Sequence, residues 1–325
     1  MNTGMVLGKF MPPHVGHKLL VDFSQSFVDE LSIVVGSLQS EPIDGESRYR
    51  WMKDSFPNSH VFHLTDENPQ TPEEHPDFWN IWCSSLLAIL ERAPEFVFAS
   101  EHYGKRLAQE LGAQFVPVNI DRDIVNINGT ACREDIEKNW EFLLPAVQLD
   151  LQKKICLIGP ESCGKTQLTK NLAQHYNASW VPEYARIYFE AINRQLCYQD
   201  MLTIAKGQIA LEESISLHRK RLIFCDTDSI TTSLWSQKLF TRIDPTIEKL
   251  SHANQHDLYL VLKPDVPWVN DPFRYSADGR EQFFKLCIDI LEKRGLRYAI
   301  ISGNWEQRFN SATKAIDLFV IQDFL

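Results

Sequence analysis

Short apolar runs alternate along this chain with stretches in which apolar residues recur every three or four positions. Continuous runs at 33–35, 96–98 and 259–262 are typical of strands that are buried on both faces of a parallel sheet. The stretches 79–90 and 283–291 have the helical period instead. This alternation predicts an α/β protein built from doubly wound parallel sheets.

The same order of elements occurs twice in the chain: a short apolar strand, then a glycine-containing loop, then a helix. We predict the strands at 5–8 and 155–158, the loops at 9–16 and 159–164, and the helices at 17–28 and 165–176. A loop of this kind, between a buried strand and a helix, presents backbone N–H groups that can bind phosphate. The sequence therefore offers a candidate nucleotide site in each half.

The second start, near residue 155, also indicates a domain boundary. Residues 134–147 have the pattern of a helix, and a polar connector at 148–154 follows it. We predict two domains of similar length, 1–149 and 150–325, each large enough to form its own core.

Composition narrows the classes of protein that fit this pattern. Of the 325 residues, 44% are hydrophobic and 23% are charged, which excludes a disordered or collagen-like chain. The net charge is −10, from 33 Lys and Arg against 43 Asp and Glu, so we expect no nucleic-acid partner. A nucleotide site on so acidic a chain must be a local pocket.

Cysteine content and hydropathy predict a cytoplasmic protein. The seven cysteines are an odd number without a CxxC pair, which fits a reducing compartment and neither a disulfide framework nor a zinc cage. No apolar run approaches the ~20 residues needed to span a bilayer, so we expect no membrane partner. A homo-oligomer is compatible with the sequence but not indicated by it.

The second loop carries the most specific motif in the chain. Residues 159–166 match G-x-x-x-x-G-K-[ST] at every required position. We expect Lys165 to bridge the β- and γ-phosphates of ATP and Thr166 to bind Mg²⁺. An ordinary glycine turn is the alternative. The predicted ATP-binding residues are Gly159, Glu161, Ser162, Cys163, Gly164, Lys165 and Thr166.

Two carboxylates follow the next buried strand. Asp226 and Asp228 come directly after the apolar run 222–225, where a metal-supporting acid is expected in a site of this kind. We predict Asp226 as a Mg²⁺ ligand and Asp228 as a catalytic residue for the substrate or as the base. The alternative for Asp228 is the N-cap of a helix that begins at Ser229.

A charged, loop-rich stretch at 264–280 is a candidate lid over the same site. It contains Trp268, Asp271, Arg274 and Arg280. Arginines in a segment beside a phosphate loop fit closure over the transferring phosphoryl group and exclusion of water. A surface loop with solvated arginines is equally compatible with the sequence.

Two further patterns are less specific. Glu183, Tyr184 and Arg186 follow a short strand-like segment and are candidates for contacts with a hydroxylated substrate. His252 and His256 have the spacing of a zinc pair on a helix, but no Glu lies between them and no third ligand is evident. For these two histidines we expect a solvated helix face.

The first loop has a phosphate-binding pattern of its own, H-x-G-H at residues 14–17. Its glycines permit close approach of the backbone and of the helix N-terminus to a phosphate. Two imidazoles there can donate N–H bonds to phosphate oxygens, charged or neutral, during group transfer. The predicted catalytic pair is His14 and His17, and the predicted ATP contacts are Gly8, Lys9, Phe10 and Gly16.

Residues 129–133 predict a second anion clamp in the first half. Thr130 and Arg133 supply a hydroxyl and a guanidinium at the start of a helix. A Thr N-cap with an exposed Arg is the alternative. Trp79 and Trp82 share one helical face, where packing in the core is the default and stacking on a substrate is the alternative.

Together these motifs resemble one family. The first half is similar to a Rossmann-like nucleotidyltransferase of the HxGH class, and the second is similar to a P-loop nucleoside kinase. The combination resembles the NadR family, which joins nicotinamide mononucleotide (NMN) adenylyltransferase to ribosylnicotinamide kinase. The resemblance rests on stretches in family order along nearly the whole chain: 8–17, 48–52, 79–82, 129–133, 159–166, 183–186, 226–232 and 268–274.

The resemblance implies roles for the predicted residues. His14, His17 and Arg133 would hold the phosphates of ATP during adenylyl transfer, and Trp79 and Trp82 would lie near the nicotinamide of NMN. In the kinase, ATP and Mg²⁺ would be held by Lys165 and Thr166, with the two aspartates beside metal and ribose. The predicted substrate contacts are Trp79, Trp82, Glu183, Tyr184, Arg186, Trp268 and Asp271.

The reaction implied by the resemblance is phosphorylation of nicotinamide riboside to NMN, then adenylylation of NMN to NAD with release of pyrophosphate. The alternatives are the same architecture with one active half or another vitamin-derived nucleoside, and a regulator that senses NAD or ATP. Some family members carry an N-terminal helix-turn-helix domain. Only a few residues precede the first predicted strand, so we expect that domain to be absent.

Overall fold

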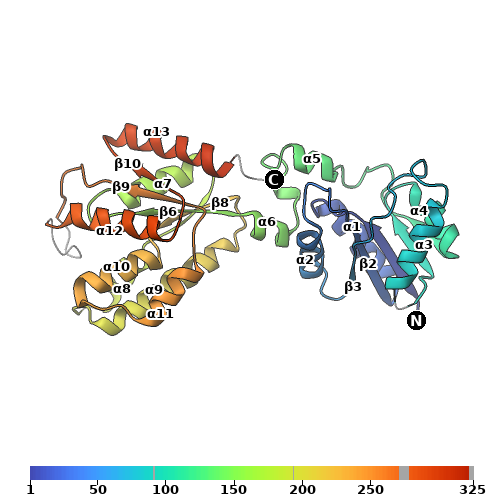
Figure 1. Cartoon of the computed structure of the whole chain (residues 1–325), viewed down its shortest axis with the longest axis horizontal. Coiled ribbons are helices and arrows are strands. Elements are labelled where there is room, and N and C mark those ends of the chain that lie inside the picture. The colour runs from blue at the N-terminus through green and yellow to red at the C-terminus, as the bar shows by residue number, and fades with distance from the viewer. Residues whose placement is uncertain (91, 193, 271–277, 322–325) are drawn as a thin grey trace. The chain divides into compact units, whose positions relative to one another are not determined.

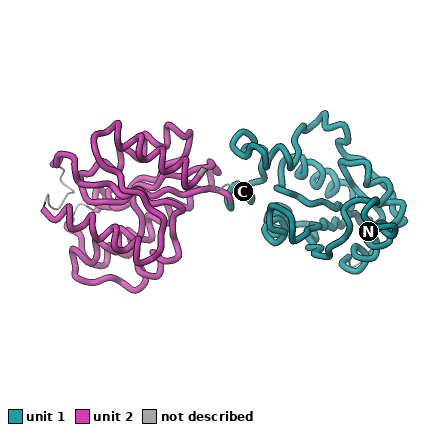
Figure 2. The backbone as a smooth tube through the Cα atoms, turned by 45° about the horizontal axis from the view of Figure 1, so that its top comes forward, with its two compact units in different colours: residues 1–150, 325 teal, residues 151–324 magenta. Residues whose placement is uncertain are grey.

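The computed structural model describes residues 1–90, 92–192, 194–270 and 278–321. The chain divides into two compact units, residues 1–150 and residues 151–324, which Figure 2 shows in different colours. Each unit contains its own parallel sheet and its own hydrophobic core.

The first unit is built on a five-stranded sheet. Its strands are β1 (Thr3–Gly8), β2 (Glu30–Gly36), β3 (His60–Leu64), β4 (Phe96–Ala99) and β5 (Gln114–Pro117), in the order β3-β2-β1-β4-β5. All the paired strands are parallel. The direction of winding reverses between β1 and β4, and ligands of such sheets bind at the carboxyl ends of the strands beside this reversal.

Helices cover both faces of this sheet (Figure 1). They are α1 (Val15–Phe27), α2 (Gly45–Ser55), α3 (Phe78–Ile89), α4 (Tyr103–Leu111), α5 (Gly129–Glu134), the 3₁₀ turn η1 (Trp140–Phe142) and α6 (Pro145–Leu151). Met5, Val34 and Val97 of the sheet pack with Leu86 of α3 and Leu107 of α4 in one core cluster. Alternation along the strands leaves the opposite face to α1 and α2.

The second unit has the same architecture. Its strands are β6 (Lys153–Ile158), β7 (Ser179–Val181), β8 (Leu222–Asp226), β9 (Leu258–Leu262) and β10 (Tyr298–Ile301), in the order β10-β9-β6-β8-β7. All the paired strands are parallel. The central strand β6 lies between β8 and β9, so the three loops that follow these strands open at one edge of the sheet.

Helices also cover both faces of the second sheet (Figure 1). They are α7 (Lys165–His175), α8 (Tyr184–Ile192), α9 (Tyr198–Ser216), α10 (Ser229–Phe240), α11 (Pro245–Ala253), α12 (Arg280–Lys293), α13 (Trp305–Ile316) and the π-helical turn η2 (Asp317–Ile321). Residues of α9, α10 and α12 pack on the face that carries Cys156, Cys225 and Tyr259. The other face is left to α7 and α13.

The prediction of two doubly wound parallel sheets is confirmed, but the helix predicted at 134–147 is wrong. The chain forms α5, a 3₁₀ turn and α6 there instead. Pro145 has no N–H and disfavours helical backbone at the residue before it, so no helix can continue through this point. The connector predicted at 148–154 is also wrong, because α6 runs to Leu151 and β6 begins at Lys153.

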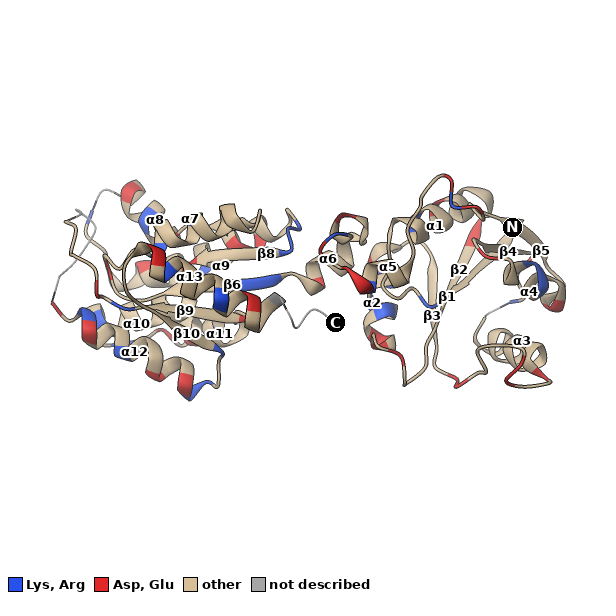
Figure 3. Cartoon of the chain, turned by 90° about the horizontal axis from the view of Figure 1, so that it is seen from above, with Lys and Arg blue, Asp and Glu red and all other residues tan. Residues whose placement is uncertain are grey.

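Charge is mixed along both units. Acidic and basic residues are interspersed over the helices (Figure 3). Among the helices of the described ranges, none combines the length and the apolar character needed to cross a membrane.

Candidate nucleotide sites

The loop after β1 fixes both predicted histidines at the start of α1. His14 is the N-cap, and its Nδ1 accepts a hydrogen bond of 3.1 Å from the N–H of Gly16. The Nδ1 of His17 accepts a bond of 3.2 Å from the N–H of His14. Because each Nδ1 is an acceptor, each neutral ring carries its proton on Nε2.

Both imidazoles are held in their neutral form. Burial and the nearby charge of Arg122 lower the pKa of His14 to about 4. Burial, His14 and Arg122 hold the pKa of His17 well below its usual range. The two rings stack with their centroids 3.8 Å apart. At neutral pH this pair therefore offers N–H donors without a charge.

The predicted anion clamp lies against the same loop. Arg133 donates hydrogen bonds from Nη1 to the carbonyl of Met11 and from Nη2 to the Thr130 hydroxyl, the latter 3.2 Å long. A Cβ on Gly129 would lie 2.5 Å from the Met11 oxygen, so the close approach of the two segments requires glycine. The alternative of a Thr cap is wrong, because Asn128 caps α5.

A buried arginine of the stretch 48–52, to which the sequence analysis assigned no role, supports this loop. Arg48 of α2 is fully buried and donates to the carbonyls of Lys9 (2.7 Å) and Gly36 (3.3 Å). It also forms an ion pair of 2.5 Å with Glu41, whose other carboxylate oxygen lies 2.8 Å from the Nζ of Lys9. The chain from 41 to 48 thus fixes the backbone from which the histidine loop departs.

The histidine loop and the anion clamp line one cavity of about 950 Å³. Every residue predicted for the first site lines it: Gly8, Lys9, Phe10, His14, Gly16, His17, Trp79, Trp82, Thr130 and Arg133. Trp79 and Trp82 also pack against the core cluster of this unit, as the default alternative predicted. Arg122 lines the cavity too and was not predicted, since no motif marks the loop that carries it.

The loop between β6 and α7 has the form expected of a phosphate loop. Gly164 has φ +89°, and a Cβ there would lie 2.5 Å from the ring of Trp305, so this position requires glycine. The Nζ of Lys165 donates to the carbonyls of Gly159 (3.1 Å) and Pro160 (3.0 Å). The lysine ammonium therefore lies inside the curl of the loop.

The predicted metal ligands are in contact. The Thr166 hydroxyl donates a hydrogen bond to Asp226 Oδ2. The other oxygen, Oδ1, is buried and has no hydrogen-bond partner among the described residues. A hydroxyl beside a carboxylate with an unused oxygen is the hard donor set that Mg²⁺ prefers, so these residues fit the predicted ion.

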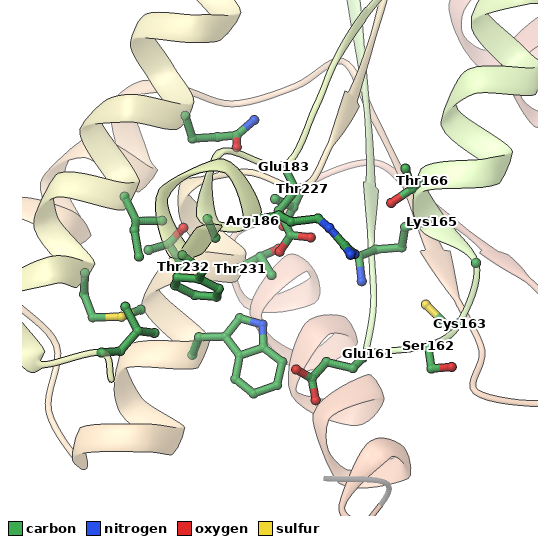
Figure 4. A pocket seen from close by; sticks show the side chains of 18 of the residues that line it. Glu161, Ser162, Cys163, Lys165, Thr166, Glu183, Arg186, Thr227, Thr231 and Thr232 are labelled. Atoms are coloured by element: carbon green, nitrogen blue, oxygen red, sulfur yellow. The ribbon is translucent and has the colours of Figure 1, made fainter. Parts of the chain in front are cut away.

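Glu183 adds an acidic group close to the lysine. Burial in the pocket, together with the negative charge of Asp226, raises the pKa of Glu183 to about 7 despite the opposing charge of Lys165. Figure 4 shows the ends of Lys165 and Arg186 pointing towards one another, with Glu183 beside them. Arg186 also forms an ion pair of 3.3 Å with Glu190.

A cavity of about 310 Å³ adjoins this loop (Figure 4). The predicted residues that line it are Glu161, Ser162, Cys163, Gly164, Lys165, Thr166, Glu183 and Arg186. The cavity extends along the start of α10, where it is lined by Thr227, Thr231, Thr232 and Trp235. The first three belong to the stretch 226–232 and were given no role from the sequence, and Trp235 was missed. The hydroxyl-rich sequence that begins α10 was the available signal for them.

Asp228 and Tyr184 do not line this cavity. Asp228 is the N-cap of α10, and its Oδ1 accepts hydrogen bonds from the N–H (2.9 Å) and hydroxyl (3.0 Å) of Thr231. The structure thus favours the capping alternative for this aspartate. The ring of Tyr184 packs where a Cβ on Gly207 would lie, on α9.

The lid prediction is only partly covered by the described residues. Asp271 and Arg274 lie outside them. Arg280 begins α12 and donates from Nη2 to the carbonyl of Ser162 (3.0 Å), and Trp268 lies 5.8 Å from its guanidinium. Arg280 therefore holds the backbone of the phosphate loop.

A second arginine, Arg308 of α13, was missed by sequence reasoning. It is fully buried and donates to the carbonyl of Cys163 over 2.8 Å. Its partners also include the carbonyls of Lys263 and Gly303, both at 2.8 Å. It thus supports the phosphate loop as Arg48 supports the histidine loop.

The solvated helix face expected for His252 and His256 is wrong for His256. Helix α11 ends at Ala253, and His256 is buried in the turn before β9. Its Nε2 lies 3.1 Å from Glu212 of α9. His256 therefore has a buried polar partner, whereas the helical spacing had predicted contact with water.

The fold and sites define a class: a nucleotidyltransferase-like α/β unit with an H-x-G-H loop, joined to a P-loop unit. A family model described as an AAA domain matches residues 154–308, a range that includes the phosphate loop. Over nearly its whole length the chain is homologous to the NadR proteins. The family resemblance seen in the sequence is thereby confirmed.

Two curated relatives illustrate this homology. The trifunctional NAD biosynthesis/regulator protein NadR of Salmonella typhimurium strain LT2 is 28% identical over 331 residues, covering 95% of this chain and 81% of that protein. The protein of the same name from Escherichia coli strain K12 is 27% identical over 329 residues, covering 94% and 80%.

Solved NadR structures share the fold of both units. A crystal structure of NadR protein in complex with NR has a TM-score of 0.71 at 23% identity, covering 98% of this chain and 96% of that one. Another, in complex with NAD and AMP-PNP, has a TM-score of 0.71 at 24% identity with the same coverage.

Proposed function

We propose that this chain makes NAD from nicotinamide riboside in two ATP-dependent steps. The second unit transfers the γ-phosphoryl group of ATP to the riboside 5′-hydroxyl and forms NMN. The first unit transfers the adenylyl group of another ATP to NMN and releases pyrophosphate. The observation that carries this proposal is the presence of two separate phosphate-binding loops, one per unit, in a homologue of proteins named for NAD biosynthesis.

In the kinase step, the phosphate loop and Lys165 bind the β- and γ-phosphates of ATP. Thr166 and Asp226 would hold Mg²⁺, which when bound neutralises charge on the phosphates and keeps the nucleotide in position. Arg186 lines the same cavity and contacts the riboside or the transferring group. The walls of the cavity exclude bulk water from the transfer.

Glu183 is the base that we propose for the riboside hydroxyl. It lines the cavity beside Lys165, whereas Asp228 is committed to capping α10 and Asp226 to the metal. The hydroxyl proton passes to the Glu183 carboxylate as the oxygen attacks the γ-phosphorus and ADP leaves. Trp235, on the wall formed by α10, gives the nicotinamide ring an aromatic surface.

In the adenylyl step, the NMN phosphate attacks the α-phosphorus of ATP and pyrophosphate leaves. The neutral Nε2–H groups of His14 and His17 and the guanidinium of Arg133 bind the phosphate oxygens as charge moves towards pyrophosphate. Trp79 and Trp82 lie on the cavity wall formed by α3 and receive the nicotinamide. Positioning and charge stabilisation suffice, and no covalent enzyme intermediate is needed.

Small molecules are the partners in this proposal: nicotinamide riboside, NMN and ATP with Mg²⁺. We place the chain in the cytoplasm, where ATP is available. The seven cysteines support this location, since all are unpaired in the structure.

The test is to supply the purified chain with nicotinamide riboside, ATP and Mg²⁺ and to identify the products over time. We expect NMN first and NAD afterwards. Lys165→Ala should lower NMN formation at least about a hundredfold and leave NAD synthesis from supplied NMN intact. His17→Ala should have the reverse effect.

A matched pair tests the choice of base. Glu183→Gln should slow NMN formation at least about a hundredfold, whereas Asp228→Asn, which keeps the cap, should slow it far less. Loss of both reactions in either the Lys165 or the His17 variant, with the fold intact by circular dichroism, contradicts the two-site proposal. Binding of ATP and NAD without any turnover would favour the sensing regulator instead.

A further inference from the structure

The core of the second unit holds a group of metal-binding side chains that the proposed reactions do not use. Cys156 of β6, Asp228 before α10 and His256 before β9 each offer one ligand atom, and these atoms lie within 4.8 Å of one another. All three residues are buried. We propose that they form a binding site for a divalent transition metal, for which Zn²⁺ is the best match.

The donors define the class of metal. A thiolate, an imidazole and a carboxylate are the usual ligands of Zn²⁺, whereas Mg²⁺ and Ca²⁺ take oxygen donors. Ligand atoms around a tetrahedral zinc ion lie about 3.3–3.8 Å apart, so atoms that are now up to 4.8 Å apart need to approach one another by at most about 1.5 Å. The three side chains come from β6, from the turn after β8 and from the turn before β9, so an adjustment of this size involves three adjacent segments of the sheet.

One oxygen of the group is not used by the helix cap. Asp228 Oδ1 accepts the capping bonds of Thr231, whereas Oδ2 is buried without a close hydrogen bond from a described residue, and the Tyr259 hydroxyl faces this carboxylate. Oδ2 lies 3.9 Å from the Nδ1 of His256. A carboxylate oxygen left unpaired in a core is costly, and a cation between Oδ2 and Nδ1 removes that cost.

The histidine is oriented as a metal ligand usually is. Its Nε2 lies 3.1 Å from Glu212 Oε2, and Glu212 Oε1 accepts a bond of 2.8 Å from the Nζ of Lys154. Lys154 belongs to the basic start of β6, which is blue in Figure 3. A carboxylate on the far nitrogen fixes the ring and leaves Nδ1 for the metal, the common arrangement around zinc-bound histidine.

The local charge also favours a cation. Burial and the negative groups around Cys156, among them Asp228 and Glu212, hold the pKa of its thiol well above the usual range. The thiol therefore keeps its proton unless a bound ion replaces it. A divalent ion there takes the place of the thiol proton. It also displaces the hydrogen bond of 3.3 Å between His256 Nδ1 and the Tyr259 hydroxyl.

This site is separate from the Mg²⁺ ligands of the phosphate loop. Asp226 bonds to Thr166 of α7. Cys156, and Cys225 that directly precedes Asp226, instead face the core under α9, α10 and α12. The proposed ion would lie on the other face of the sheet and join β6 to the turn after β8. It would therefore fix the start of α10 without taking part in the transfer, and the inference does not depend on the proposed function.

A second trio shares the histidine: Glu212, Cys225 and His256. The first trio is favoured because both oxygens of Glu212 already have partners, Lys154 and His256, while Asp228 Oδ2 has none among the described residues. The experiment can separate the two, because each contains a different cysteine.

The probe is Co²⁺, added to the chelator-treated full-length chain in equal amount and in excess. A thiolate-bound cobalt ion gives a charge-transfer absorption band and the strong visible bands of tetrahedral Co²⁺. Cobalt at Thr166 and Asp226 gives no such band, since both of those ligands are oxygens. We expect about one thiolate-bound Co²⁺ per chain, displaced by Zn²⁺.

Variants identify the ligands. Cys156→Ala should abolish the band, and Asp228→Asn, which keeps the cap, should weaken binding at least about tenfold. Cys287→Ala is the matched control, because Cys287 is buried in the same core cluster but belongs to neither trio. This control should bind like the parent. Circular dichroism in chelator confirms that each variant is folded.

Three outcomes overturn the proposal. The first is a folded parent chain that gives no thiolate band with excess Co²⁺. The second is loss of the band in Cys225→Ala but not in Cys156→Ala, which would assign the metal to the other trio. The third is equal loss in Cys287→Ala, which would show that the core as a whole, and not a ligand set, was disturbed.

Discussion

At the scale of single residues, buried arginines hold the two phosphate-binding loops in shape. Arg48 donates to backbone carbonyls next to the histidine loop, and Arg308 donates to the carbonyl of Cys163 in the phosphate loop. Both side chains are fully buried. Removing a buried charge that satisfies several carbonyls leaves those carbonyls without a donor. Each arginine is therefore a positioning residue, and its loss should disturb the site by shifting the backbone of the loop.

We predict that Arg48→Met lowers adenylyl transfer to NMN at least about tenfold and leaves NMN formation by the second unit unchanged. The carbonyls of Lys9 and Gly36 lose their donor, and Glu41 loses its arginine partner and keeps Lys9 and the N–H of Leu38. The free energy of unfolding of the first unit should fall by about 3 kcal/mol. Parallel assays of the two reactions and a denaturant titration measure both effects.

Arg50→Met is the control on the same helix. Arg50 is half exposed and forms one ion pair, 2.7 Å long, with Asp150. Such a pair contributes little to stability, about 0.5 kcal/mol, so this variant should resemble the parent chain in both assays. An equal loss of adenylyl transfer in the two variants would show that the loop does not depend on Arg48.

The residue scale also shows what the sequence can and cannot reveal about a site. The phosphate loop and the H-x-G-H loop were predictable because their residues are adjacent and their spacing is set by the phosphate they bind. Arg48, Arg122 and Arg308 act from other elements, and Arg308 contacts a carbonyl 145 positions away. No spacing rule connects partners so distant in the chain.

At the scale of elements, the start of α9 depends on one carboxylate. Asp200 accepts two hydrogen bonds of 2.7 Å from Arg194, one of 2.8 Å from the Tyr188 hydroxyl of α8, and one of 2.8 Å from the N–H of Cys197. The bonds from Arg194 come first among the causes that hold the pKa of this carboxyl below its usual range. Asp200 thus caps α9 and ties it to α8.

We predict that Asp200→Asn costs about 1 kcal/mol at neutral pH, the usual loss for a capping side chain. Because the folded pKa is below the unfolded value of 3.8, the carboxylate stabilises the fold above that pH and loses this effect as the pH falls towards the folded pKa. The variant should therefore lose less stability than the parent between about pH 6 and about pH 3. Chemical denaturation at a series of pH values measures the difference.

Asp289→Asn provides the matched control, since Asp289 is an exposed carboxylate on α12 of the same unit. It should keep the parent's stability and the parent's dependence on pH within a few tenths of a kcal/mol. If the Asp200 and Asp289 variants respond to acid alike, the cap of α9 is not the source of the predicted acid sensitivity.

Elements differed in how far the sequence predicted them. Strands were found from continuous apolar runs, because both faces of these parallel sheets are buried. The region 134–147 was misread because apolar residues at helical spacing also occur where a short helix, a turn and another short helix each bury a few side chains. Asp228 was ambiguous for a similar reason: a carboxylate after a strand fits either a cap or a catalytic role until its contacts are known.

At the scale of the whole molecule, the core clusters of the two units share no residues among those that the structure describes. One cluster is formed by residues between Met5 and Phe115, and another by residues between Cys156 and Tyr298. Chains whose domains have independent cores usually unfold in more than one transition. A single melting temperature would therefore not describe this protein.

We predict that truncating one core lowers one thermal transition and spares the other. Leu86→Ala in α3 and Leu291→Ala in α12 each remove a fully buried side chain and should cost about 3 kcal/mol in their own unit. Calorimetry locates the shifted transition, and residual assays after brief heating identify the unit: Leu86→Ala should lose adenylyl transfer first, and Leu291→Ala should lose NMN formation first. If both variants shift the same transitions equally, the two cores unfold as one cooperative body. In that case heating should abolish both proposed reactions together.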